Sequence, residues 1–144
     1  MSPGAEPIKP NLPGSDDNRV FTLRTVPDTL KIRAYVEQNK PKSAVVIGGG
    51  YIGMEMAENL KHAGLDVTVV EMAEHIIAPL DSDMASLVQH YARENGIRLI
   101  LKNGVQALIP AKSHIEVQLS HGTLNADLVL MSVGVKPETA IAQK

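Results

Sequence analysis

The stretch from Val45 to Glu55 reads VVIGGGYIGME, and it decides the fold of this 144-residue chain. Residues 43–47 are apolar and mostly β-branched, which predicts a buried strand. Residues 51–63 favour a helix that ends at Gly64, and residues 67–71 predict a second buried strand. A strand, a short glycine loop, a helix and a strand form a βαβ unit, which implies a parallel sheet with a right-handed crossover.

The glycines of this stretch follow the spacing GxGxxG, which is used where a backbone must approach a diphosphate. Gly48 suits the tight turn, Gly50 lets the diphosphate approach, and Gly53 lets the helix pack close to the strand. Gly49 is permitted by the pattern but not required by it. The backbone amides of Tyr51 and Ile52 then become the natural donors to an anion at the start of the helix.

A carboxylate at the end of the second strand indicates which ligand is bound. Glu71 follows Gly50 by roughly 20 residues, where an acid typically accepts hydrogen bonds from the adenine ribose. Glu71 would repel a 2′-phosphate, and no arginine or lysine follows it before Arg93. NAD(H) is therefore favoured over NADP(H), with His75 as the one nearby group that, when protonated, would attract a phosphate. The alternative, that the glycines merely build a turn, leaves Glu71 unexplained.

The remaining segments extend this α/β pattern. A helix is expected from Asp28, as its cap, to about residue 39, and a third helix begins near residue 82. In the latter, apolar residues recur at helical spacing (Met84, Leu87, Val88, Tyr91, Ala92). The expected fold is a Rossmann-like doubly wound parallel sheet with a three-stranded antiparallel meander. The further strands are expected at 97–101 and 128–133 in the sheet, and at 105–109, 115–119 and 123–125 in the meander.

Composition excludes several classes of function. The net charge of −2 and the aromatic content of 3% argue against nucleic acid as a partner. The chain has no cysteine, which removes disulfides, thiolate metal sites and thiol catalysis and fits a cytoplasmic location. Its apolar runs are too short for a bilayer span, and its N-terminus does not resemble a signal peptide. The remaining histidines lack metal-ligand spacing, so no metal site is expected (His62, His90, His114, His121). No Ser/His/Asp arrangement has the context of a nucleophile, so no catalytic side chain is expected either.

The stretch VVIGGGYIGMEMAENL resembles the NAD(P)H-binding domain of FAD-dependent pyridine nucleotide-disulfide oxidoreductases. Within that family it is most similar to coenzyme A-disulfide reductases, persulfide reductases and NADH oxidases. Four other segments carry the same resemblance, in the same order, and cover nearly the whole chain (SPGAEPIKPNLPG, FTLRTVPDTLKIRAYV, VVEMAEHIIAPLDSDMA and ADLVLMSVGVKPET).

The resemblance implies how the chain is organised. Residues 1–40 would be a lead-in from an FAD domain with a connecting helix, and residues 41–144 an NAD(H)-binding domain. FAD and the redox cysteine would lie mostly elsewhere in a homodimeric parent that also has a C-terminal interface domain.

It also implies roles for three residues: Tyr51 would cover the nicotinamide pocket, Glu55 would reach the nicotinamide end, and Gly134 would pass near the nicotinamide ribose. From its position alone, Glu55 would be an acid that stabilises the first turn of the helix, and the two roles are compatible. Two alternatives for the whole chain are a stand-alone nucleotide-binding regulatory module and an FAD-binding domain.

Overall fold

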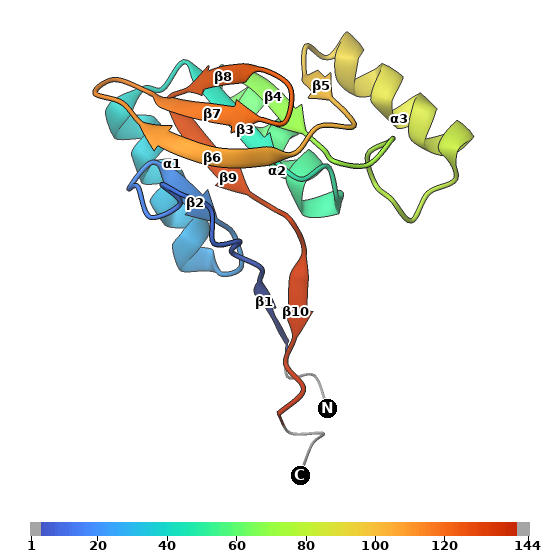
Figure 1. The fold of residues 1–144 in the computed structure, drawn as a ribbon, viewed down its shortest axis with the longest axis horizontal. Helices are drawn as coiled ribbons and strands as arrows, with labels where there is room; N and C mark the ends of the chain where they lie inside the picture. The colour runs from blue at the N-terminus through green and yellow to red at the C-terminus, as the bar shows by residue number, and fades with distance from the viewer. Residues whose placement is uncertain (1–3, 141–144) are drawn as a thin grey trace.

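The computed structural model describes residues 4–140, and it confirms the βαβ unit. Strand β3, helix α2 and strand β4 follow one another as expected, and β3 pairs with β4 in parallel. They form the centre of a five-stranded parallel sheet with the order β2-β9-β3-β4-β5 (Figure 1). The fold class predicted from the sequence is therefore confirmed. The bounds are β1 Ala5–Pro7, β2 Val20–Thr22, α1 Val26–Asn39, β3 Ser43–Ile47, α2 Tyr51–His62, β4 Asp66–Val70, α3 Ser82–Glu94, β5 Arg98–Ile100, β6 Val105–Pro110, β7 Ile115–Leu119, β8 Thr123–Ala126, β9 Leu128–Met131 and β10 Val135–Pro137.

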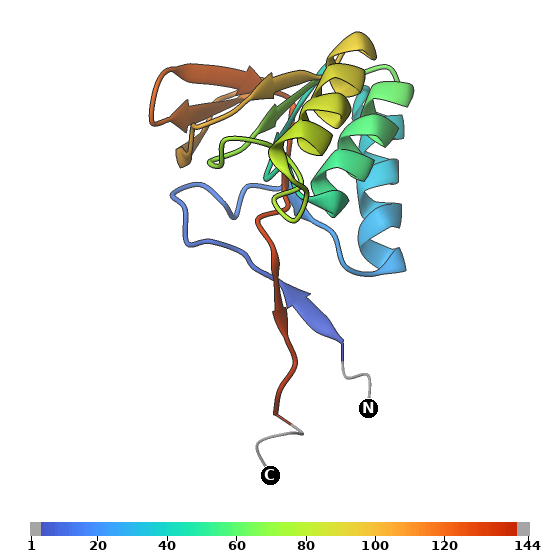
Figure 2. The ribbon, with the colours of Figure 1, turned by 90° about the vertical axis from the view of Figure 1, so that its right-hand side faces the viewer.

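The two faces of the sheet are covered by different layers. The three helices lie along one face, and the antiparallel sheet β6-β7-β8 covers the other (Figure 2). Alternate residues of a strand point to opposite faces, so Val46 and Val69 pack under the helices whereas Val45 and Val70 pack under the meander. Both central strands are therefore buried on both sides, which is why they read as continuous apolar runs.

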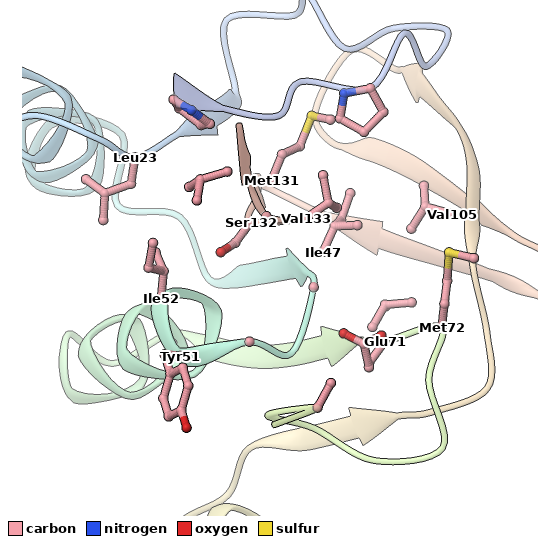
Figure 3. A pocket seen from close by; sticks show the side chains of 18 of the residues that line it. Leu23, Ile47, Tyr51, Ile52, Glu71, Met72, Val105, Met131, Ser132 and Val133 are labelled. Carbon is pink, nitrogen blue, oxygen red and sulfur yellow. The ribbon is translucent and has the colours of Figure 1, made fainter. Parts of the chain in front are cut away.

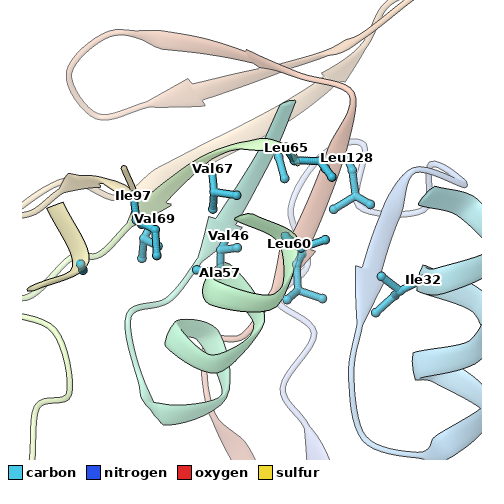
Figure 4. Close-up of a cluster of buried hydrophobic side chains, with 12 residues drawn as sticks. Ile32, Val46, Ala57, Leu60, Leu65, Val67, Val69, Ile97 and Leu128 are labelled. Carbon is cyan, nitrogen blue, oxygen red and sulfur yellow. The ribbon is translucent and has the colours of Figure 1, made fainter. Parts of the chain in front are cut away.

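The helix-side core joins all three helices to the sheet. Ala57 and Leu60 of α2 pack on Val46, and Ile32 of α1 and Ala92 of α3 belong to the same cluster (Figure 4). Burying one aliphatic side chain of this size stabilises a fold by roughly 1.5–3 kcal/mol. This cluster therefore fixes α2 against β3 and β4 and determines where the start of α2 lies.

Residues of the expected lead-in form two strands that their short local pattern did not predict. Strand β2 pairs in parallel with β9 at the edge of the main sheet. Strand β1 pairs antiparallel with β10, and the two run together away from the body of the fold (Figure 1). Residues before 41 thus contribute to the parallel sheet, and the division of the chain at 41 stays a prediction. Residues 1–3 and 141–144, which belong to the two predicted segments, lie outside the described residues.

Two local expectations about the helices need correction. Asp28 is not the cap of α1: Thr25 occupies that position, and Asp28 is its partner in a capping box, accepting from the Thr25 amide at 2.8 Å. In α3 the periodic apolar residues correctly predict a helix, but most of them do not lie on its buried face. Met84, Leu87 and Tyr91 are exposed, whereas the small residues Ala85 and Ala92 are buried (exposed large side chains: Met84 52%, Leu87 65%, Tyr91 62%). Small side chains allow α3 to lie close to its neighbours.

A half-buried ion pair joins the segment before β2 to the meander. The Asp17 carboxylate accepts from Arg19 Nε at 2.8 Å and from its Nη2 at 2.9 Å. Arg19 Nη1 donates to the carbonyls of Ala111 and His114, in the turn between β6 and β7, at 3.1 Å each. The hydrogen bond from Arg19 holds the pKa of Asp17 below its ordinary value. A lowered folded-state pKa stabilises the fold above the unfolded pKa and loses that effect as the pH falls through the folded value.

We therefore expect Asp17→Asn to lower the free energy of unfolding at pH 7 by about 2 kcal/mol, as for a hydrogen bond to a charged group. The difference from the wild type should shrink as the pH falls below the ordinary carboxyl pKa of 3.8. Urea unfolding at pH 7, 5, 4 and 3 measures it. Glu37→Gln is the matched control, since the Arg33–Glu37 pair is exposed and should contribute less than about 1 kcal/mol. If the free energies of unfolding of the variant and the wild type differ by the same amount at every pH, this account is contradicted.

Candidate dinucleotide-binding site

At the junction between β3 and α2, backbone atoms leave no room for a side chain at Gly48 and Gly53. A Cβ on Gly48 would lie 2.2 Å from the Ser132 carbonyl oxygen, and Gly48 has a φ of 103°, which side chains rarely allow. A Cβ on Gly53 would lie 2.0 Å from the Gly48 carbonyl oxygen. The loop therefore turns sharply off β3 and lies against both β9 and the first turn of α2. These contacts agree with the turn and packing roles predicted for the two glycines.

Gly50 differs from them, because a Cβ there would meet nothing within 4 Å. It is the N-cap of α2, it makes no side-chain cap, and the first turn of the helix contains no acidic residue. Among residues 4–140, the amides of Tyr51 and Ile52 have no acceptor within the chain. The space in front of Gly50 is thus open and faces free N–H donors at the positive end of the helix dipole.

Glu71 lies beside this loop, at the carboxyl end of β4. One of its oxygens accepts from the Gly49 amide at 2.7 Å, and the other accepts from the Ala73 amide at 2.8 Å. Each carboxylate oxygen has a second lone pair, so both can also accept from a ligand hydroxyl. The carboxylate is therefore held at the same edge of the sheet as the glycine loop, as the sequence predicted.

A cavity of about 580 Å³ opens at this edge, a volume within the range typical of small-molecule sites. Figure 3 shows Tyr51 and Ile52 at the start of α2 on one side of it and Glu71 and Met72 at the end of β4 on the other. Six of the nine residues predicted to bind the coenzyme line this cavity (Gly48, Gly50, Tyr51, Ile52, Glu71, Gly134), and three do not (Gly49, Gly53, Glu55).

The residues assigned to the nicotinamide end lie in different places. Tyr51 is 56% exposed at the mouth of the cavity. Gly134 follows β9 with a φ of 113°, and its carbonyl accepts from the Ile8 amide at 2.9 Å. Glu55 is exposed and lies beyond the first turn of α2, so its reading as an acid of that turn is wrong. The role of each residue toward nicotinamide stays a prediction.

The loop after Glu71 is contacted by a lysine from another part of the chain, which spacing along the sequence did not reveal. Lys102, at the end of β5, donates its amide to the Ala73 carbonyl and pairs its ammonium with Glu74 at 2.6 Å. The Lys102 ammonium lowers the pKa of Glu74. His75 bonds through Nδ1 to the Ile76 carbonyl at 3.0 Å. The pair leaves no uncompensated positive charge at Lys102, and among residues 4–140 no lysine or arginine lines the cavity.

Much of the cavity wall is apolar and comes from segments that carry no local binding signal. Figure 3 shows Leu23, Ile47, Met131 and Val133 on the side away from Glu71. Residues of the first 12 positions complete this wall (Pro7, Pro10, Leu12). Pro7 pairs with Val135 of β10, and just after Leu12 the Pro13 carbonyl accepts from the Leu108 amide of β6. Contacts with distant parts of the chain therefore place this segment, and no pattern along the sequence identifies it.

The fold and the glycine junction define a Rossmann-like α/β protein, and comparison with known proteins gives its family. Residues 1–144 match the family described as pyridine nucleotide-disulphide oxidoreductase, and the chain belongs to it. Its homologues are oxidoreductases, some of them described as NAD-dependent or FAD-dependent. Between residues 4 and 140, no helix is both long and apolar enough to cross a membrane.

Three similar proteins illustrate the match. The chain is 40% identical over 146 residues to an NADH oxidase of Methanocaldococcus jannaschii, covering 100% of this chain and 32% of that protein. The structure of reduced CoADR-RHD from Bacillus anthracis is 41% identical with a TM-score of 0.89 and covers 98% of this chain and 25% of its own. The structure of an NAD-dependent persulfide reductase from A. fulgidus is 33% identical with a TM-score of 0.90, and the match covers 97% of this chain and 26% of that one. The chain thus spans about a third of the length of the curated relatives.

Proposed function

We propose that this chain is the NADH-binding domain of an FAD-dependent pyridine nucleotide-disulfide oxidoreductase. The observation that carries this proposal is the open space at Gly50, with free amides at the start of α2 on one side and the Glu71 carboxylate on the other. A diphosphate accepts hydrogen bonds from such amides, and an adenine ribose donates them to such a carboxylate. The family and its NADH-dependent members support the same ligand.

The residues of this chain would bind and orient the coenzyme. The amides of Gly50, Tyr51 and Ile52 would hold the diphosphate, and Glu71 would hold the adenine ribose. The nicotinamide would then extend toward the apolar wall formed by Leu23, Met131 and Val133, which excludes water. NADH supplies a hydride when it is bound, and the acceptor would be FAD held by another domain of a longer, homodimeric, cytoplasmic protein with a C-terminal interface domain. The chain alone would bind NADH without turning it over.

Calorimetric titration of the chain with NADH, NADPH and FAD tests the proposal. We expect NADH to bind with the highest affinity, because Glu71 disfavours a 2′-phosphate and, in the described part of the chain, no lysine or arginine lines the cavity. FAD uses the same glycine pattern, so it is the most informative competitor. Tighter binding of FAD than of NADH would refute the proposal in favour of an FAD-binding domain.

Replacing the acid tests the adenosine end of the site. We expect Glu71→Gln to weaken NADH binding about tenfold, because it removes a charged acceptor from two hydroxyl groups. In the same variant the affinities for NADH and NADPH should differ less than in the wild type, because the repulsion of the 2′-phosphate is lost. Glu74→Gln is the matched control, since Glu74 lies three residues away, is exposed and lies outside the cavity lining. Equal effects of the two substitutions on NADH affinity would show that Glu71 does not contact the coenzyme.

A further inference from the structure

The peptide between Gly49 and Gly50 is held from behind by two residues of the loop after β4. The Ile77 amide donates to the Gly49 carbonyl oxygen at 2.7 Å. Ile76 is fully buried, and its Cγ2 lies 2.8 Å from the place that a Cβ on Gly49 would take. Neither isoleucine lines the cavity. We call Ile76 and Ile77 the clamp.

The clamp has an unfavourable backbone that its surroundings enforce. Ile77 has a φ of 51°, in the left-handed region that β-branched residues rarely adopt. It is nevertheless only 7% exposed, and its carbonyl accepts from the Leu80 amide at 2.8 Å. The Ile76 amide donates to Gln89 Oε1 of α3 at 3.3 Å, so the clamp is anchored to that helix. Strained residues of this kind cluster at binding and catalytic sites.

The contact with Ile77 determines which way the next amide points. The peptide bond is trans, so the Gly49 carbonyl and the Gly50 N–H point in opposite directions. Because the Gly49 carbonyl points to Ile77, the Gly50 N–H points away from Ile77 and from the loop after β4. Gly50 lines the cavity and Gly49 does not, and among residues 4–140 the Gly50 N–H has no acceptor. The other polar group of Gly49, its N–H, is already bonded to Glu71 at 2.7 Å.

We propose that Ile76 and Ile77 are positioning residues that aim the Gly50 amide at the coenzyme diphosphate. This inference rests on the proposed function and adds to it a part of the chain that touches no ligand. It explains why Gly49, which the sequence pattern permits but does not require, has no room for a side chain: a methyl group there would push against Ile76 and tilt the peptide that carries the Gly50 N–H.

A size exchange between Gly49 and Ile76 tests the clamp. Gly49→Ala places a methyl group 2.8 Å from Ile76 Cγ2, whereas its contact with Glu71 Cβ, at 3.4 Å, is an ordinary van der Waals distance. Gly49 does not itself line the cavity, and it does not have a left-handed φ that would disfavour alanine. We expect Gly49→Ala to weaken NADH binding roughly tenfold, as for the loss of one hydrogen bond to a charged group. Ile76→Ala should also weaken binding by loosening the clamp. The double variant should bind NADH more tightly than either single variant, because the new methyl group fills the space that Ile76 leaves.

Calorimetry with NADH on the wild type, both single variants and the double variant measures these affinities, and thermal unfolding measures their stabilities. If Gly49→Ala binds NADH with wild-type affinity, the inference is overturned, whether or not the melting temperature of the variant is lower. If Gly49→Ala does not fold, the comparison of Ile76→Ala with the double variant decides: the double variant must bind more tightly. Failure of the wild type to bind NADH refutes the proposed function itself, so the two failures are distinct.

Discussion

Gly53→Ala is expected to lower the free energy of unfolding by about 3 kcal/mol or more, the upper range for overpacking a tight contact. In an ordinary helix the same substitution stabilises by roughly 1 kcal/mol, because alanine is the better helix former. Here the new Cβ would lie 2.0 Å from the Gly48 carbonyl oxygen and 3.5 Å from Val46 Cγ1. Backbone on one side and the core strand on the other leave no flexible group to move, so we expect the sign of the effect to reverse.

Urea unfolding of the wild type and the variant measures this effect. Glu58→Ala is the matched control, since Glu58 is an exposed residue of the same helix and its replacement should change stability by less than about 0.5 kcal/mol. An unchanged or raised urea midpoint in Gly53→Ala would mean that α2 does not lie as close to β3 as the structure has it. The close packing required by the glycine pattern would then be absent.

Gly50→Asp should weaken NADH binding without lowering the stability of the fold. Gly50 is the N-cap of α2 with φ −73° and ψ −177°, an extended conformation that aspartate adopts readily. Aspartate is among the most favourable N-cap residues, so the variant should be as stable as the wild type or more stable by a few tenths of a kcal/mol. Its carboxylate would occupy the free amides of the first turn and repel the diphosphate. The loss of two charge-assisted hydrogen bonds, each about 1.5–3 kcal/mol, predicts at least a hundredfold loss of NADH affinity.

Thermal unfolding and NADH calorimetry on the same samples test this prediction. Asn59→Asp changes the charge by the same amount at an exposed position of α2, and it should leave NADH affinity within about twofold of the wild type, as expected of a distant exposed charge. A Gly50→Asp variant that still binds NADH as the wild type does would place the diphosphate elsewhere.

The core of the fold was predictable because its signals are local. The apolar runs at 43–47 and 67–71 and the glycines between them specify a strand, a turn and a helix without reference to the rest of the chain. The strands β1, β2 and β10 were not predictable in this way. Each has three residues, and β1 and β2 pair with β10 and β9, more than a hundred positions away. The buried face of α3 was predictable only in part, because Ala92 belongs to the periodic apolar residues but Ala85 does not, while the larger Met84, Leu87 and Tyr91 remain exposed.

The candidate site likewise has one part that local sequence predicts and another that depends on long-range contacts. The glycine loop and Glu71 were found because their spacing reflects one continuous βαβ unit. The apolar wall from Pro7, Pro10 and Leu12 depends on long-range pairing. Lys102 reaches the loop after Glu71 only because β5 lies beside β4. Ile76 and Ile77 act on Gly49 through one hydrogen bond and one van der Waals contact that no sequence motif records.

A titration of the ¹⁵N-labelled chain with NADH, followed by amide NMR, tests the central claim most directly. The account predicts that the largest and saturable shifts belong to the amides of Gly50, Tyr51 and Ile52, with Ala73 next to Glu71 also affected. Shifts centred instead on Ser43, Asp66 and Arg98, at the opposite edge of the sheet, would contradict it.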